Sequence, residues 1–498
     1  MMERRLFEDA EGADPTSGEP GPGEPLRGTP RLRVACRDQI VMRMLALDQM
    51  LPADDEARTV VAFVEQCDLA ELYDSILAVE GQAGRAPADP QILLSLWLYA
   101  TIKGIGSARE LNRQCQLHLG FQWICGDVSM NYHTLSDFRV DHGAVLDRLL
   151  TEQVAELMSV GAVTLQRVAQ DGMRVRASAG ASSFRRKPTL EECLVEAQEQ
   201  VTTLKEEVLK DPAATSRRQQ AARERAARER EQHVRDALEA CAQVQAAKEK
   251  RGGDSLKNPA RGSTTDPDAR KMKMPDGGTR PAFNVQFGTD TASQIIVGVD
   301  VTNQGTDHGL MTPMIEQIED RTGQRPQEYL ADGGFNTNEE IDSLNDPSEN
   351  AQPVADAQPV ADAHPVANTH PVADAQPVAN TQPVADSRTC HGTKLYVPVK
   401  DVDRKRKKGI DPFVPLPNDT PQRAEWRQRM GTEAAKQIYK ERASTAECVN
   451  ALARQRGLTQ FRVRGLAKVK IIATWFALAH NVLRWAYFRS SARLVNAT

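Results

Sequence analysis

The stretch RVAQDGMRVRAS, residues 167–178, places a single carboxylate, Asp171, after a short apolar run of β-prone residues. A glycine follows the acid, and Arg174 and Arg176 come after it at alternating positions. Because Asp and Gly favour turns, we expect a core strand that ends at Asp171. Alternate residues of a strand point to the same side, so the two arginines should share a face. The stretch predicts a strand-end acid surrounded by positive charge.

A second acid occurs in the same setting. EYLADGGFN, residues 328–336, reads as a strand that ends in Asp332 and two glycines. Between the two stretches, residues 283–303 have the pattern of two strands around a turn, DTAS, and residues 308–323 have the spacing of an amphipathic helix. KLYVPVK, residues 394–400, is a further strand. Strands and helices in this order predict a mixed α/β core.

A helical excursion interrupts this core between residues 189 and 250. Apolar residues recur every seven positions in its first half, as in Leu190, Ala197 and Leu204, and an Asp-Pro pair then breaks the helix. The second half is highly charged. We expect an antiparallel helical hairpin with a coiled-coil-like seam. Its arginines fit a solvated face, and gripping DNA is the alternative.

Helical patterns also dominate residues 38–160. PQILLSLWLYATIKGI, residues 90–105, has Pro90 at the first position of an expected helix and a dense apolar face. SARELNRQCQLHLGF follows after two glycines, and another pair of helices comes later. A helix, a short turn and a second helix is the outline of a helix-turn-helix, and a plain helical bundle fits the same pattern.

Two segments are of low complexity. Residues 352–387 are six tandem hexamers of the type QPVADA. Pro at every sixth place excludes a regular helix and a central strand, so we expect a flexible, partly polyproline-II loop that the chemistry does not need. Residues 8–30 are rich in Pro, Gly and acids, and they should form a disordered tail.

The composition excludes several classes of protein. Eight cysteines are scattered without a Cys-x-x-Cys pair, which argues against a zinc ribbon and a disulfide framework and fits a reducing cytoplasm. We expect no signal peptide, because the N-terminus lacks an apolar segment. The most apolar stretch, residues 470–488, contains His480, Asn481 and Arg484, and it predicts a buried core helix rather than a membrane span. The net charge of −5 hides basic stretches at 174–187, 403–408 and 462–470.

Metal-dependent chemistry at two strand-end acids needs a third ligand. Hard cations such as Mg²⁺ prefer carboxylate oxygens, and two ions about 4 Å apart can hold both reacting oxygens of a phosphodiester in line. QIYKERASTAECVNALARQRG, residues 437–457, supplies Glu447, with Arg454 on the same helix face. An exposed helix with ordinary ion pairs is the alternative interpretation. The segment lies in a region, 420–488, that reads as helical throughout, after a basic loop at 403–409.

Together these motifs resemble the DDE transposases of bacterial insertion sequences, in particular the group around insertion sequence 1182. VAQDGMRVRAS resembles the strand with the first catalytic Asp, and LADGGF resembles the second. YKERASTAECVNALARQRG resembles the Tyr-Arg-Glu-Lys signature around the catalytic Glu. Residues 263–286 and the stretch VRGLAKVK are also similar to that group. The motifs follow the family's order over residues 38–488.

The resemblance implies a transposase that binds the ends of an insertion sequence, cleaves the DNA and joins the 3′ ends to target DNA by hydrolysis and transesterification. It implies Asp171, Asp332 and Glu447 as catalytic, metal-holding acids. The implied cofactor is Mg²⁺, in two copies, with Mn²⁺ as a substitute. A catalytically inactive, transposase-derived DNA-binding protein is the alternative function.

The implied partner is double-stranded DNA, both the terminal inverted repeats of the element and the target. A homodimer would bind it in the bacterial cytoplasm, without a membrane. Phosphate and DNA binding would rest on Tyr439, Arg442 and Arg454. Arg174 and Arg176 would face DNA beside the first acid, and the alternative for both is pairing with acids of the helical hairpin.

The fold class implied is α/β, a ribonuclease-H-like catalytic core with a helical insertion, preceded by an all-α N-terminal domain. We expect a disordered acidic tail at 1–37, a helical DNA-binding domain at 38–162, a first part of the core at 163–345 with the inserted hairpin at 187–258, the repeat loop at 346–388, and a second part of the core with C-terminal helices at 389–490.

The chain departs from the family signature at two positions. The signature has three residues between its Arg and Glu, whereas four separate Arg442 from Glu447. On a regular helix the extra residue turns Glu447 by about 100° relative to Arg442. Either Arg442 lies off the metal-binding face, or the helix is locally widened there. The second departure is Arg454 in place of Lys, which keeps the charge but alters the geometry of a phosphate contact.

Overall fold

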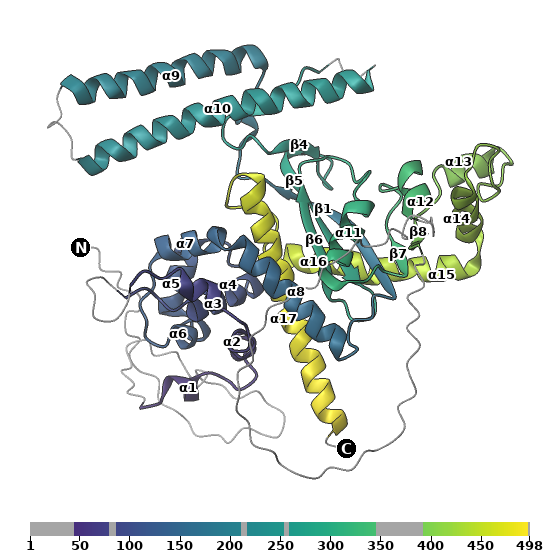
Figure 1. Cartoon of the computed structure of the whole chain (residues 1–498), viewed down its shortest axis with the longest axis horizontal. Helices are drawn as coiled ribbons and strands as arrows, with labels where there is room; N and C mark the ends of the chain where they lie inside the picture. Colours follow the sequence, from purple (N-terminus) through teal and green to yellow (C-terminus); the bar gives the residue numbers. More distant parts are fainter. Residues whose placement is uncertain (1–43, 79–85, 211–216, 253–257, 345–391, 497–498) are drawn as a thin grey trace, which may run out of the picture. The chain divides into compact units, whose positions relative to one another are not determined.

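A computed structural model describes residues 44–78, 86–210, 217–252, 258–344 and 392–496 (Figure 1). The predicted tail at 1–37 and the six hexamers at 352–387 lie outside the described residues. The described residues from Leu47 onward form one unit, so the N-terminal helices and the sheet belong to the same body.

A six-stranded mixed sheet carries the predicted α/β core. Its path runs β4-β5-β1-β7-β8, and β6 pairs with β5. Strand β1 is antiparallel to β5 and parallel to β7, and β7 is parallel to β8. The strands are β1 (Arg167–Arg176), β4 (Arg270–Lys273), β5 (Thr279–Asp290), β6 (Ile296–Thr302), β7 (Glu328–Leu330) and β8 (Lys394–Tyr396). The predicted hairpin at 283–303 is therefore confirmed as β5 and β6.

Asp171 lies in the middle of β1, so the prediction that it ends a strand is wrong. The pairing of β1 with β5 runs without a break from Val168 opposite Asp290 to Arg176 opposite Ala282. Gly172 continues the strand because it gives room to a neighbour: a Cβ there would lie 2.5 Å from Oδ1 of Asp307. A glycine inside a strand often marks such a close approach rather than a turn.

Eight helices precede β1 in the described part of the chain. α4 begins at Pro90, where Asp89 accepts a hydrogen bond from the backbone of Gln91. It is buried around most of its circumference, whereas α5 buries only Leu111. The helices are α1 (Leu47–Met50), α2 (Glu56–Val64), α3 (Ala70–Asp74), α4 (Pro90–Ile102), α5 (Ala108–Leu117), α6 (Leu119–Cys125), α7 (Tyr132–Asp141) and α8 (Gly143–Ser159).

The long helix α17 (Leu466–Asn496) joins these helices to the sheet, since it packs on α4, α8 and β6. By length and composition, Leu466–Arg489 is the one described helix that could cross a membrane, but it is mostly buried inside the protein. The side chain of Asn481 donates to the carbonyl of Ile296 and accepts from its amide, at 2.8 and 2.9 Å. His480 and Arg484 bond the carbonyls of the turn before β6. The predicted buried core helix is confirmed.

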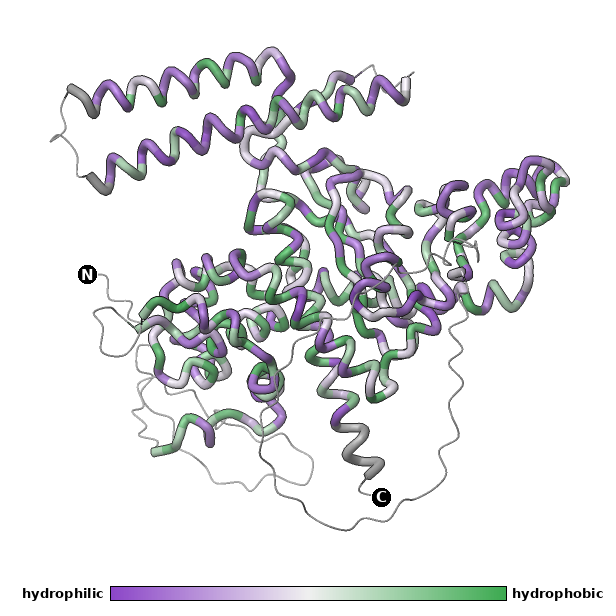
Figure 2. The backbone as a smooth tube through the Cα atoms, in the orientation of Figure 1, coloured by the Kyte–Doolittle hydropathy of each residue, from purple (hydrophilic) through white to green (hydrophobic). Residues whose placement is uncertain are grey.

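The predicted helical hairpin consists of α9 (Lys187–Lys210) and α10 (Arg217–Arg251), which run side by side in Figure 1. Leu190 is buried against Ala237 and Cys241. The remaining surface is largely hydrophilic in Figure 2. Arg228 and Arg235 pair with glutamates one turn earlier on α10. These pairs favour the solvated-face interpretation of the hairpin's arginines.

Two predictions near the C-terminus need correction. Residues 402–407 form a short helix, α13, rather than a loop, because Lys and Arg are good helix formers. Residues 420–488 are not helical throughout: the chain turns between Gly457 and Gly465, both at positive φ. The other helices are α11 (Met311–Thr322), α12 (Asn338–Leu344), α14 (Pro421–Gly431), α15 (Glu433–Arg442) and α16 (Cys448–Gln455), and a second, two-stranded sheet pairs β2 (Phe184–Arg185) with β3 (Gly262–Ser263).

Candidate catalytic site

Two carboxylates come together at the seam between β1 and β7. The parallel register places Ala169 opposite Leu330. Asp171 and Asp332 each lie two residues beyond this last pair, and the charge of Asp332 raises the pKa of Asp171. Asp332 follows the end of β7, and its Oδ1 accepts a hydrogen bond of 2.6 Å from the amide of Gly334. The structure therefore brings the first two predicted acids to adjacent positions.

Asp171 is largely buried, and this burial dominates its electrostatics. Its Oδ1 accepts from the Gly172 amide at 2.9 Å, and its Oδ2 accepts from the side chain of Asn450 at 3.0 Å. Desolvation raises the pKa of Asp171 to about 6, Arg442 opposes this rise, and the nearby charge of Asp332 adds to it. The cost of burying the charged carboxylate is therefore larger than the stabilisation from its partners, as it is at many functional sites.

The third acid arrives through a widened helix. Residues Ala443–Glu447 form a π-helical segment, η3, between α15 and α16. A π-helical turn bonds residue i to i+5 and so accommodates one extra residue. Arg442 and Glu447 are five residues apart, and their side chains meet at 2.5 Å. Of the two alternatives for the departure from the family signature, the widened helix is the one found.

Arg442 lies between the first and third acids. Its Nη1 is 3.7 Å from Oδ2 of Asp171, and its Nη2 bonds Oε1 of Glu447. The guanidinium lies over the ring of Tyr439, 5.7 Å from the centroid. Burial raises the pKa of Tyr439, which keeps the phenol neutral. The guanidinium is thus held in place with its charge shared by two carboxylates.

A salt-bridge cluster at the start of β1 positions α15. Arg167 bonds Glu328, the first residue of β7, and reaches Glu441 of α15 at 2.6 Å. Tyr396 of β8 donates to the same Glu328 at 3.0 Å. Because Glu441 precedes Arg442, this cluster fixes the end of α15 against the strands that carry the two aspartates.

Asn450 belongs to the site but was not predicted. It is buried on α16, three residues after Glu447, and it bonds Asp171. Its Oδ1 is buried and has no hydrogen-bond partner among the residues that the structure describes. The i to i+3 spacing from Glu447 places both side chains on one helix face, and this was the available signal.

The donor set suits a hard cation in its chemistry. Asp171, Asp332 and the orphaned oxygen of Asn450 are oxygen ligands of the kind that Mg²⁺ prefers, and a cation would offset the desolvation of Asp171. In the part of the chain that the structure describes, however, no group of three or more His, Cys, Asp or Glu side chains is arranged to hold a metal ion. Glu447 is half-exposed and tied to Arg442 instead.

The predicted DNA-binding arginines of β1 do not lie beside Asp171. Strand alternation puts Arg174 and Arg176 on the opposite face. Arg174 pairs with Asp307, 3.3 Å away in the loop after β6, rather than with the helical hairpin. Arg176 is exposed at the end of the strand. Arg454 is exposed on α16, and its guanidinium forms no bond within the described residues.

A buried polar network occupies the face of the sheet opposite Asp171. Asp307 Oδ1 accepts from Asn284 at 2.6 Å and from Gln286 at 2.9 Å, and Oδ2 accepts from Arg174. Gln286 in turn accepts from Gln170, the neighbour of Asp171 in β1. The network fills the sheet behind the first acid with side-chain hydrogen bonds and leaves Asn284 Oδ1 without a partner among the described residues.

Changing Asp307 to Ala should lower the free energy of unfolding by about 3 kcal/mol, because three donors then lose their acceptor in a buried place. Urea denaturation measures this loss. Asp300→Ala is the control, since Asp300 pairs with Lys470 at the surface and such pairs contribute less than about 1 kcal/mol. Equal losses in the two variants would contradict the role given to the network.

Comparison with known families places transposase domains at both ends of the described chain. The model Transposase domain (DUF772) matches residues 45–141, which hold most of the N-terminal helices. The model Transposase DDE domain matches residues 413–486, which include Arg442, Glu447 and Asn450. No curated protein and no solved structure matches the chain. The two matches support a DDE transposase family and a nuclease or transposase class of enzyme.

Proposed function

We propose that this chain, which two family models match as a transposase, is a DDE transposase of the group around insertion sequence 1182. It binds the ends of an insertion sequence, cleaves the DNA and joins the 3′ ends to target DNA. The observation that carries the proposal is the π-segment η3. It preserves the meeting of Arg442 with Glu447 despite the extra residue, next to Asp171. A widened turn kept at this position is typical of a functional site.

The strand order supports a ribonuclease-H-like core for this enzyme. Three antiparallel strands, β6, β5 and β1, are extended on the other side of β1 by two parallel strands, β7 and β8. The first acid stands on the central strand β1 and the second at the end of its parallel neighbour. Helices that follow β8 supply the third, so the site needs elements from the whole core.

Each residue of the site has a role in this proposal. Asp171, Asp332 and Glu447 would hold Mg²⁺, or Mn²⁺ in its place, with Asn450 orienting Asp171. Two bound ions would supply charge stabilisation at the attacking and leaving oxygens of the phosphodiester. Arg442, supported by Tyr439, is placed to move from Glu447 to a phosphate oxygen, which suits its planar donors. Arg454 lies two helical turns from Glu447 and would contact DNA further along.

The proposed partner is double-stranded DNA in the bacterial cytoplasm, at terminal inverted repeats and at the target. The helices at 45–141 would contact the ends of the element. Two ends must be held together for joining, which favours a homodimer on DNA. Both proposals extend beyond the transposase class that the family matches support.

The direct test uses DNA that carries the inverted repeats flanking the gene. Incubated with the full chain and Mg²⁺, the ends should be nicked, and their 3′ ends should become joined to a target plasmid. Sequencing of the junctions measures both steps. Cleaved but never joined ends would identify a nuclease, and intact ends would contradict the proposal.

The alternative function, an inactive transposase-derived DNA-binding protein, has two observations in its favour. Glu447 is paired with Arg442, and the described residues form no three-ligand metal group. The same assay separates the two functions, since the inactive protein binds the repeats but leaves them intact with Mg²⁺.

Cleavage should fall as the pH is lowered, because burial raises the pKa of Asp171 and the protonated group no longer presents a carboxylate. The hydrogen bond from Asn450 lowers the pKa of Asp171, so Asn450→Ala should raise it and move the acid limb of the profile to higher pH. A pH–rate profile measures the shift. Asn258→Ala, at an exposed position, is the control, and identical acid limbs in both variants would refute the link.

A further inference from the structure

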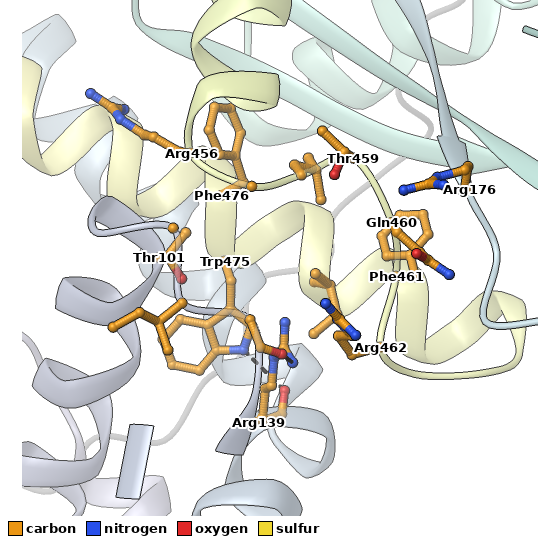
Figure 3. A pocket seen from close by; sticks show the side chains of 16 residues that line it. Thr101, Arg139, Arg176, Arg456, Thr459, Gln460, Phe461, Arg462, Trp475 and Phe476 are labelled. Carbon is orange, nitrogen blue, oxygen red and sulfur yellow. Dashed lines mark hydrogen bonds between the residues drawn. The ribbon is translucent and has the colours of Figure 1, made fainter. Parts of the chain in front are cut away.

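An arginine-rich pocket lies away from the two aspartates, and neither the family matches nor the proposed catalytic site assigns it. It is lined by the turn between α4 and α5, α7, the end of β1, the segment that follows α16, and α17 (Figure 3). Its cavity holds about 140 Å³. A buried water needs only about 10–15 Å³ on this measure, so the pocket has room for an anion with several oxygens.

The backbone of the pocket is tightly constructed. Gly104 and Gly457, both at positive φ, face each other, and a Cβ on Gly457 would lie 2.9 Å from the carbonyl of Gly104. The Arg176 amide donates to the carbonyl of Thr459 at 3.1 Å, and the Phe461 amide donates to the carbonyl of Arg176 at 2.8 Å. These contacts join the N-terminal helices, β1 and the 456–465 segment at one point.

Three arginines from different elements line this pocket. Arg139 comes from α7, Arg176 from β1 and Arg462 from the 456–465 segment. Within the described residues, none of the three forms an ion pair. Arg139 and Arg462 both lie against Gly106, each 3.9 Å from where its Cβ would be. Arg456 also lines the pocket, but in Figure 3 its side chain extends away from the others.

The position of Arg139 is fixed by its neighbours rather than by an acid. Its Nη1 donates to the carbonyl of Gly106 at 2.6 Å, and its guanidinium lies over the ring of Trp97, 4.7 Å from the centroid. Burial, together with the positive charge of Arg462, lowers the pKa of Arg139 to about 10. Uncompensated positive charge in such a pocket favours an anion whose oxygens can accept from the planar donors of the guanidiniums.

We propose that this pocket, formed by Arg139, Arg176 and Arg462, binds one backbone phosphate of the DNA substrate. The inference rests on the proposed function and adds a specific contact outside the catalytic site. Arg176 is five residues from Asp171 along β1, a separation of ~17 Å at about 3.4 Å per residue. Because Arg176 faces away from Asp171, the pocket would contact the duplex at the end of β1 rather than on the face of the sheet that carries Asp171.

The test measures binding of a fluorescein-labelled DNA duplex of arbitrary sequence over a range of salt concentrations. Arg176→Gln and Arg462→Gln should each weaken binding about tenfold at low salt. Each should reduce the slope of log affinity against log salt by at most about 0.9, the value for one phosphate. The double variant should lose about 0.9 in total and not twice this value, because both arginines contact one phosphate.

Arg280→Gln is the matched control, because Arg280 is already paired with Asp276 at 2.5 Å. This substitution should leave the salt dependence of DNA binding unchanged. Arg176 is exposed, so its variant should keep the parent's unfolding temperature and remain informative if an Arg139 variant does not fold.

Unchanged slopes in the arginine variants, with intact DNA binding by the parent, overturn the assignment of a phosphate to this pocket and leave the proposed function standing. A parent that binds no DNA overturns both. In a third outcome, the variants bind DNA normally while inorganic phosphate raises the unfolding temperature of the parent. That result would identify a site for free phosphate and would also overturn the inference.

Discussion

End cleavage should fall by at least about 10²–10³-fold in Asp171→Asn, the scale on which loss of one charge-stabilising group slows enzymes. Asp171 lies on the central strand beside Asp332, and Arg442 approaches it from the helix that carries Glu447. The amide keeps the size of the carboxyl group but carries no charge and would hold a cation poorly. Cleavage of labelled inverted-repeat DNA with Mg²⁺ measures the loss, and binding of the same DNA should be largely retained.

The same variant should be more stable than the parent at neutral pH. The pKa of Asp171 is higher in the folded chain, about 6, than the ordinary value of 3.8, so the folded state binds the extra proton between these values. The charged form then costs stability as the pH rises through this window, and the cost is fully present above about pH 6. Its removal should add up to about 3 kcal/mol at pH 7 and nothing below about pH 4.

Thermal unfolding at both pH values checks this gain. Asp300→Asn, in β6 and paired with Lys470 at the surface, is the control that should keep full cleavage. Lower stability together with lost cleavage would indicate a structural role for Asp171. Undiminished cleavage by Asp171→Asn would remove it from the catalytic site altogether.

An alanine inserted after Ser444 should reduce cleavage about 10²-fold or more, whereas deletion of Ser444 should leave it within about tenfold of the parent. The deletion leaves Arg442 and Glu447 four residues apart, so a regular α-helix places them on one face again. The insertion adds a second extra residue and turns Glu447 and Asn450 by about 100° away from Asp171. Ser444 is exposed, and its loss removes a 3.4 Å contact from Gln294 to its carbonyl and a local 3.0 Å hydrogen bond from its hydroxyl to the carbonyl of Glu441.

Cleavage of inverted-repeat DNA compares these variants, with unfolding temperatures as a check on folding. An alanine inserted after Gly409, in the turn that follows α13, is the control for insertion as such. Full activity of the Ser444 insertion, or total loss in the deletion, would show that the helical register of Glu447 does not matter.

The site could be predicted in part because its acids stand in local patterns. Asp171 and Asp332 come beside β-prone runs, and Glu447 lies in a long helical region, so period alone assigns each acid to an element. The burial of helix α17 was equally predictable, since His480 and Asn481 inside an apolar helix require partners in the protein. The ends of strands and helices were harder to predict. Asp-Gly at 171–172 looks like a turn, but β5 pairs with the strand on both sides of it.

Contacts between distant parts of the chain had no local signature. Asn450 meets Asp171 across a separation of 279 residues, and Asp307 meets Arg174 across 133. The pocket of Arg139, Arg176 and Arg462 likewise draws one side chain from each of three separate elements. Their spacing in sequence carries no information on these meetings.

By itself, the sequence determined the chemical groups and the type of element that carries each of them, because side-chain periodicity depends only on local backbone geometry. It also left two alternatives for the position of Glu447 relative to Arg442, a regular helix with the two on different faces or a locally widened helix. Tertiary structure decided between them, since a π-turn forms only where packing against β1 and β5 holds the widened helix. It also decided that β1 continues past Asp171, because β5 pairs with it on both sides of that residue, and in a continuous strand Arg174 and Arg176 face away from Asp171.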